Sequence, residues 1–152
     1  MEDIIQIGEK APDFTLKDQN GEDVALSDFK GKKVLLSWHP LAWTSVCTDQ
    51  MRSLEREYER FAEKNTIVLG LSVDSAPSKS AWAKVLVLKK VKILADFNPL
   101  GKVAKAYGIF SDVYGASKRA NILIDENGIV IWNKKYDIPV LPEVEEVLAQ
   151  IK

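Results

Sequence analysis

Three apolar runs, each followed by a stretch with helical character, limit the folds open to this chain. The runs are residues 32–38 (KKVLLSW), 65–74 (NTIVLGLSVD) and 91–96 (VKILAD). Short runs of Val, Ile and Leu such as these predict strands that are buried on both faces. Because the strands alternate with helices, we expect an α/β fold whose central sheet is mainly parallel and is covered by helices on both faces.

Two other segments predict hairpins. Residues 13–26 alternate in polarity on either side of Asn20 and Gly21, a pair that tolerates the positive φ of tight hairpin turns. Residues 119–125 and 129–137 flank the turn sequence DENG in the same way. Hairpins add antiparallel pairs, so we expect a central mixed sheet with an N-terminal β-hairpin extension.

Residues 44–61 show the clearest helical pattern. Their apolar side chains recur at spacings of four, three, four and three, at Cys47, Met51, Leu54, Tyr58 and Phe61. This spacing predicts one amphipathic helix. Residues 78–90 and 100–108 are expected to be helical, and Pro142 is expected in the first turn of a last helix. The five lysines between positions 79 and 92 are typical of a solvated helix face.

Length and charge exclude several classes of function. At 152 residues the chain is expected to form a single domain, residues 1–152. Its net charge of −1, with acids and bases interspersed, provides no surface for nucleic acid. No apolar run approaches membrane length, and the first residues lack the pattern of an export signal. A single cysteine cannot form an internal disulfide and survives best in a reducing compartment, so we expect a cytoplasmic protein.

Cys47, the only cysteine, supports two interpretations. It opens the apolar stripe of its helix, and free cysteines are often buried packing residues. It also lies in the first helical turn, where unpaired backbone N–H groups and the positive end of the helix dipole favour a thiolate. The helix directly follows a predicted strand, and ligands of open α/β sheets bind at the carboxyl ends of strands. A reactive cysteine would belong at such a place.

Residues 40–47 (PLAWTSVC) match the Pro-x-x-x-Thr-x-x-Cys signature of the peroxiredoxins, thiol peroxidases with a thioredoxin-like fold. Four more segments resemble the family in the expected order, residues 8–16, 70–75, 94–108 and 117–130. Several spaced matches are harder to obtain by chance than one. The chain is therefore similar to AhpC/TSA-type peroxiredoxins over nearly its whole length. With one cysteine, it resembles their bacterioferritin-comigratory (PrxQ) and AhpE-like groups.

The resemblance implies a role for each matched side chain. The Cys47 thiolate would attack a peroxide oxygen and become a sulfenic acid. Thr44 would place its hydroxyl beside sulfur and peroxide, and Pro40 would shape the pocket without adding a donor. Arg119 would hold the thiolate and donate to the peroxide, with the backbone N–H groups near Cys47 completing the pocket. Taken alone, Thr44 is more typical of an N-cap, Pro40 of a strand end and Arg119 of a surface ion pair.

Two positions depart from the family pattern. His39 stands where an aromatic residue such as tyrosine is common, and is either a titratable group near the pocket or a hydrogen-bonded structural histidine. Gln50 stands where glutamate often orients the arginine, which leaves open how Arg119 is supported.

The missing second cysteine decides how the reaction would end. An external thiol has to reduce the Cys47 sulfenic acid, and thioredoxin, glutaredoxin or a low-molecular-weight thiol would serve. No metal or cofactor is expected. The aromatic residues Trp43, Trp82 and Tyr114 would permit a homodimer. Two alternatives remain, namely a redox sensor or relay that passes oxidation to a partner protein, and a noncatalytic thioredoxin-like binding domain with Cys47 as packing.

Overall fold

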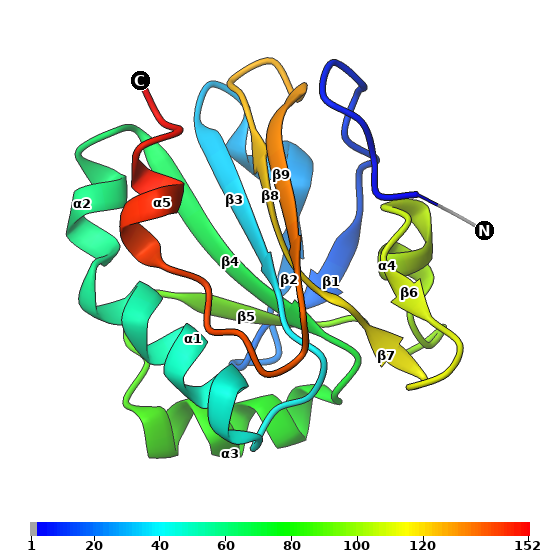
Figure 1. Cartoon of the computed structure of the whole chain (residues 1–152). Helices are drawn as coiled ribbons and strands as arrows, with labels where there is room; N and C mark the ends of the chain where they lie inside the picture. The colour runs from blue at the N-terminus through cyan, green and yellow to red at the C-terminus, as the bar shows by residue number, and fades with distance from the viewer. Residues whose placement is uncertain (1–2) are drawn as a thin grey trace.

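A seven-stranded mixed sheet with strand order β2-β1-β5-β4-β3-β8-β9 runs through the molecule (Figure 1). The computed structural model describes residues 3–152. Its central strands β3 (Lys33–Trp38), β4 (Thr66–Ser72) and β5 (Lys92–Ala95) are parallel. The other neighbours in this sheet pair antiparallel, including β3 with β8. The sheet is therefore mixed as expected, but its parallel part is limited to three strands.

Both predicted hairpins are present at the sheet edges. β1 (Thr15–Lys17) pairs with β2 (Asp23–Ala25), and β1 joins the sheet where Lys17 pairs with Ala95 of β5. β8 (Arg119–Ile124) and β9 (Val130–Tyr136) form the second hairpin. Strands β6 (Phe110–Ser111) and β7 (Ala116–Ser117) form a separate small sheet. Two residues per strand are too few to produce a recognisable polarity pattern, so the sequence did not predict them.

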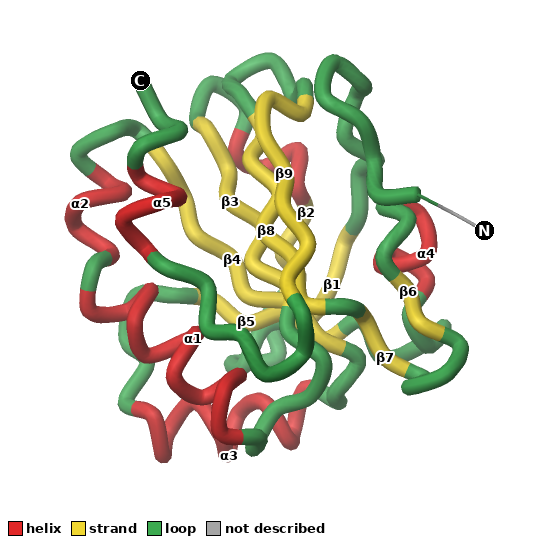
Figure 2. Tube along the Cα trace, in the orientation of Figure 1, coloured by secondary structure: helices red, strands yellow, loops and turns green. Residues whose placement is uncertain are grey.

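Helices cover both faces of the sheet (Figure 2). One face carries α1 (Ser45–Arg56), α2 (Tyr58–Ala62), α3 (Ala76–Leu86) and α5 (Val144–Leu148). The other face carries the N-terminal segment, the 3-10 turn η1 (Leu26–Phe29) and α4 (Lys102–Ala106). Side chains of the central strands alternate between the two cores, so that Leu35 packs with α1 and α3 whereas Leu36 packs with α4.

The helix boundaries correct three expectations. The helix predicted over residues 44–61 is divided, because Glu57 leaves the helical conformation at φ −99° and ψ 12°. α3 ends at Leu86 because Val87 adopts the left-handed conformation, so residues 88–90 are not helical. Pro142 precedes the N-cap Glu143 of α5 instead of lying in its first turn.

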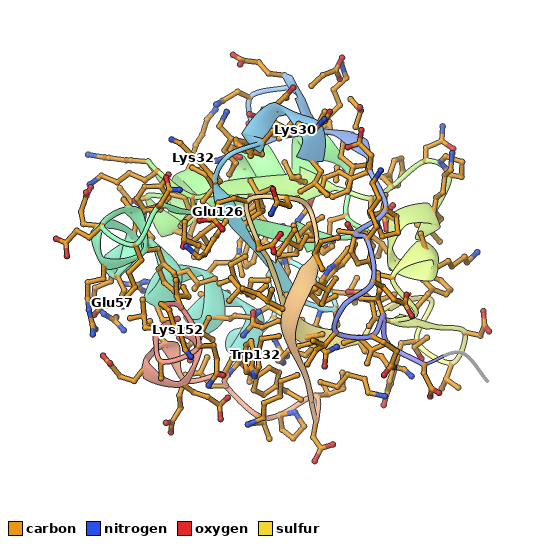
Figure 3. The ribbon with its side chains drawn as sticks, turned by 90° about the horizontal axis from the view of Figure 1, so that it is seen from above. Lys30, Lys32, Glu57, Glu126, Trp132 and Lys152 are labelled. Atoms are coloured by element: carbon orange, nitrogen blue, oxygen red, sulfur yellow. The ribbon has the colours of Figure 1, made fainter. Side chains whose placement is uncertain are left out.

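One glycine brings α1 into direct contact with the sheet. A Cβ on Gly70 of β4 would lie 2.5 Å from the Sδ of Met51, so a larger residue fits only if α1 moves or the Met51 side chain changes rotamer. This contact places the start of α1, one turn before Met51, over the carboxyl end of the parallel strands. Figure 3 looks from above onto the opposite end of the molecule, where Lys30, Lys32 and Glu126 lie. Within residues 3–152, no helix is long and apolar enough to cross a membrane.

Candidate active site

The site forms where the three parallel strands end. β3 is followed by His39 and Pro40, β4 by Asp74 and β5 by Asp96, and these positions meet at one edge because neighbouring parallel strands end on the same side. The loop of residues 39–44 then leads from β3 into α1.

Asp74 fastens this loop to the end of β4. Its Oδ2 accepts hydrogen bonds from the backbone N–H of Ala42 at 2.7 Å and from the Ser72 hydroxyl at 2.6 Å. Trp43 has a φ of 73°, in the left-handed region, and its Nε1 donates to the Ser78 hydroxyl at 3.1 Å. The left-handed backbone conformation is energetically unfavourable for a residue as large as tryptophan, so the tertiary contacts must hold the loop in place.

Cys47 is the third residue of α1, as the sequence predicts. Thr44 is the N-cap, and the first helical bond runs from the N–H of Thr48 to the Thr44 carbonyl at 2.9 Å. The N–H groups of Val46 and Cys47 come before that bond and have no acceptor within the helix. The positive end of the helix dipole therefore lies at the sulfur.

Arg119, the first residue of β8, reaches the sulfur from a neighbouring strand. Its Nη1 donates to the Cys47 Sγ at 3.3 Å and to the Gln50 Oε1 at 2.7 Å. Its Nε and Nη2 donate to the Ile138 carbonyl at 3.2 Å and 2.8 Å. The guanidinium is only 1% exposed, so its charge acts on the sulfur with little screening by water.

Gln50 supplies the support for Arg119 that the sequence left open. Its Nε2 donates to the Ser37 hydroxyl at 2.8 Å and to the Trp38 carbonyl at 3.2 Å, which turns the Oε1 toward Arg119. Because the amide is neutral, it orients the guanidinium without neutralising its charge.

Thr44 and Pro40 are placed differently from Arg119. The Thr44 hydroxyl donates to the Leu41 carbonyl at 2.9 Å, and its side chain is exposed, so the expected contact with the sulfur is not formed. Pro40 is buried in the loop before α1. The structure thus brings Cys47 and Arg119 together, with Pro40 nearby in the chain, and leaves Thr44 bonded elsewhere.

The sulfur is not accessible in this conformation. Cys47 is 0% exposed and belongs to the core cluster that contains Met51 and Trp82. The expectation of an exposed thiolate is therefore wrong for this conformation. Trp82 is 1% exposed, so it cannot lie on a dimer surface as the sequence suggested.

Lys79 was missed because the lysine-rich stretch was assigned to a solvated face. It is 0% exposed, and its Nζ lies 3.3 Å from the His39 Nε2. The signal for its burial was the spacing of Lys79 with Trp82 and Ala83, at i, i+3 and i+4 on the buried side of α3. His39 is buried beside Lys79, and burial, with Lys79 next, holds its pKa well below the ordinary value.

A cysteine in the first turn of a helix, after a central strand of a mixed α/β sheet and bonded to a buried arginine, defines the class of thiol peroxidases with a thioredoxin-like fold. Similarity to known proteins identifies the family within this class. The AhpC/TSA family matches residues 7–133. The chain belongs to that family, the peroxiredoxins.

Individual relatives are similar over most of the chain. Alkyl hydroperoxide reductase E of Mycobacterium tuberculosis is 35% identical over 128 residues, 84% of this chain and 83% of that protein. Peroxiredoxin 2 of Picrophilus torridus is 33% identical over 97% of this chain and 75% of its own length. The reduced 2-Cys peroxiredoxin of Plasmodium vivax has a TM-score of 0.86 at 32% identity, covering 93% of this chain and 78% of that one. The chain is accordingly a peroxidase that reduces peroxides at the expense of thiols.

Proposed function

We propose that Cys47 is the residue that attacks the peroxide, in a one-cysteine cycle that an external thiol completes. The observation that carries the proposal is the 3.3 Å hydrogen bond from the buried Arg119 Nη1 to the Cys47 Sγ. A buried guanidinium on a cysteine at a helix start stabilises the thiolate, which is the nucleophilic form. This pair has no evident purpose in a noncatalytic binding domain, where a neutral thiol would pack without a cation.

The reaction follows from the charges at the site. An electron pair of the Cys47 thiolate forms the S–O bond while the O–O bond breaks, and the leaving oxygen takes up a proton to become water or an alcohol. Negative charge moves from the sulfur toward the leaving oxygen during this step. Arg119 and the N–H groups of Val46 and Cys47 are the donors that stabilise it.

Pro40 and Thr44 act once the loop of residues 39–44 has opened. Pro40 has no N–H group and so adds no competing donor at the pocket wall. The Thr44 hydroxyl has to rotate away from the Leu41 carbonyl, where it now donates, before it can contact a peroxide.

The substrates and partners are inferred from chemistry and from the relatives. The name of the Mycobacterium tuberculosis relative supports alkyl hydroperoxides as substrates beside hydrogen peroxide. With no second cysteine in the sequence, thioredoxin, glutaredoxin or a low-molecular-weight thiol reduces the sulfenic acid. A reduced thiol is maintained best in the cytoplasm. Exposed Trp43 and Tyr114, at 52% and 62%, provide apolar surface for a homodimer of this single-domain chain.

The proposal is tested by mixing reduced protein with one equivalent of peroxide in a stopped-flow instrument. We expect one thiol to be lost within seconds, with a mass gain of one oxygen, and Cys47→Ser to remove both signals while the circular dichroism stays unchanged. Oxidation of Cys47 no faster than that of free cysteine would contradict the proposal. Oxidation without turnover on added thiols, but with a mixed disulfide to a partner protein, would identify a redox relay instead.

A further inference from the structure

The loop between β9 and α5, residues 137–143, reaches the active site from the end of the second hairpin (Figure 1). Arg119, the first residue of β8, pairs across the hairpin with Tyr136, the last residue of β9. The chain that leaves β9 therefore passes directly beside Arg119. The family match ends at residue 133, so this loop lies outside it. Any role of the loop at the site therefore rests on its own contacts.

The contact with the site is made by the main-chain carbonyl of Ile138. This one oxygen accepts from the Nε of Arg119 at 3.2 Å and from the Nη2 at 2.8 Å. On the other side of the guanidinium, the Nη1 donates to the Gln50 Oε1 at 2.7 Å. Because the guanidinium is a rigid planar fork, bonds on both sides fix its plane and its direction. The Nη1 is thereby held 3.3 Å from the Cys47 Sγ.

Both groups that hold Arg119 are electrically neutral. Within residues 3–152, none of the ion pairs involves Arg119, so no carboxylate compensates its charge. A carboxylate in place of the Ile138 carbonyl would bind the guanidinium more strongly, but it would also oppose the charge that Arg119 presents to the sulfur. Neutral acceptors orient the guanidinium and leave its charge uncompensated. Its position then depends on how firmly the carbonyl itself is held.

The Ile138 carbonyl is held by a tight turn. The N–H of Val140 donates to the Asp137 carbonyl at 3.0 Å, which closes a turn over residues 137–140. Pro139 has a fixed φ and disfavours the helical conformation for the residue before it, so the direction of the Ile138 carbonyl has little freedom. The turn therefore presents this carbonyl to the guanidinium in one orientation.

We propose that the turn of residues 137–140 is a positioning element of the active site, which directs Arg119 at the Cys47 sulfur through the Ile138 carbonyl. The inference rests on the proposed role of Cys47 as the attacking thiolate. The turn contains no side chain that reacts with a peroxide, so its effect reaches the sulfur only through the guanidinium. A change in the turn should therefore alter the thiolate and its rate of attack, and should have no effect once Arg119 is absent.

Pro139→Gly tests the turn, because glycine removes the restriction that the proline places on the Ile138 carbonyl. Leu141→Gly is the matched control, since it adds a glycine to the same loop beyond the turn. We expect Pro139→Gly to slow oxidation of Cys47 by hydrogen peroxide about tenfold, because displacing a charged donor weakens its effect on the reaction. Leu141→Gly should resemble the parent protein. Equal slowing by the two glycines would overturn the inference.

The thiolate itself is measured by its ultraviolet absorbance over a range of pH, as the difference from the Cys47→Ser protein. Because Cys47 is the only cysteine, this difference reports one group. We expect Pro139→Gly to form its thiolate at higher pH than the parent, a change that a loss of stability alone would not produce. A folded Pro139→Gly protein with the parent's absorbance profile would overturn the inference.

A double mutant shows whether the turn acts through Arg119. In an Arg119→Met background the guanidinium is absent, so Pro139→Gly should cause no further slowing of Cys47 oxidation. The same slowing in this background as in the parent would mean that the turn acts by another route, and would overturn the inference.

A measurement on the unaltered turn decides the matter even if Pro139→Gly fails to fold. The carbonyl carbon resonance of Ile138 reports hydrogen bonding to its oxygen by NMR. We expect this resonance to change with pH in the parent at the same midpoint as the thiolate absorbance, and the change to be absent in Cys47→Ser and in Arg119→Met. An Ile138 resonance that is the same in the parent and in Arg119→Met would show that the bond is not formed, and would overturn the inference.

Failure of the proposed function would give a different result. Cys47 of the parent would then be oxidised no faster than free cysteine, while the Ile138 resonance would still follow the thiolate. In that case the turn positions Arg119 on the sulfur, and the inference stands without the peroxidase role of Cys47.

Discussion

We expect the reactivity proposed for Cys47 to depend most on Arg119. It is the only cation that the structure shows bonded to the sulfur within residues 3–152. We expect Arg119→Met to slow oxidation of Cys47 about 100-fold to 1000-fold, the loss found when a preorganised donor to a developing charge is removed. Stopped-flow oxidation by hydrogen peroxide measures this, with Arg52→Met as the control because Arg52 is exposed on α1. Equal rates for the two variants would mean that Arg119 is structural.

Gln50 contributes to stability as well as to the position of Arg119. Its amide makes three buried hydrogen bonds, to Ser37, Trp38 and Arg119. Gln50→Ala removes these three buried bonds, so we expect the free energy of unfolding to fall by about 2–3 kcal/mol and oxidation of Cys47 to slow. Urea denaturation measures the first effect. Unchanged stability would indicate that water replaces the amide.

Individual site residues were predictable from the sequence to different degrees. Cys47 and Arg119 lie in motifs with fixed neighbours, and the structure brings them together. The Thr44 hydroxyl was not predictable, since a short polar side chain at an N-cap has a nearby backbone carbonyl as an alternative partner, here that of Leu41. The burial of Lys79 was missed because the prediction relied on its charge, which is typical of a solvated face, and not on its position on the apolar side of α3.

The contact between Met51 of α1 and Gly70 of β4 determines how closely α1, and with it Cys47, approaches the sheet. Gly70→Ala would place a Cβ 2.5 Å from the Met51 Sδ, so α1 has to move or Met51 has to change rotamer. Overpacking of this kind costs about 1–3 kcal/mol, which we expect as a loss in the free energy of unfolding. Because Met51 lies one turn after Cys47, the thiol should also become more accessible to alkylating reagents.

A double mutant separates this contact from other effects of the alanine. The Met51→Ala protein lacks the Met51 sulfur that a Cβ at position 70 would meet. In that background, Gly70→Ala should destabilise the protein much less than it does in the parent. Additive losses in the double mutant would show that α1 does not rest on Gly70. Denaturant titration of the four proteins provides the comparison.

The elements with long periodic patterns were predicted well, and those decided by one backbone conformation were not. The three central strands and both hairpins lie where the polarity pattern placed them. The ends of α1 and α3 depend on the backbone conformations of Glu57 and Val87. A left-handed valine is unfavourable by itself, so no local propensity would indicate it.

The molecule as a whole collects titratable groups at one edge of its sheet. His39, Asp74 and Asp96 follow successive parallel strands, and Cys47 and Lys79 approach them from helices. The thioredoxin-like order of strands and helices made a site at this edge predictable. The number of buried charges was not predictable, because it depends on which side chains fill the space between α3 and the strand ends.

These buried groups make the stability of the whole fold dependent on pH. The pKa of Lys79 is about 7 in the folded protein and has an ordinary value of 10.5 when the chain is unfolded. Between these values the unfolded chain binds a proton at Lys79 that the folded chain lacks, so stability rises with pH across this window. His39 affects stability at lower pH. Its pKa in the folded protein lies below the ordinary value of 6.5, so the unfolded chain takes up a proton first and stability is lost as the pH falls below 6.5.

We therefore expect the free energy of unfolding of the parent, relative to that of Lys79→Met, to increase between about pH 7 and about pH 10, by at most ~1.4 kcal/mol per pH unit. Taking the difference between the two proteins cancels the titration of the groups they share. Urea denaturation at a series of pH values measures it, and the same comparison with Lys84→Met should show no such slope because Lys84 is exposed. Parallel stability profiles for the parent and Lys79→Met would mean that Lys79 keeps its proton in the folded core.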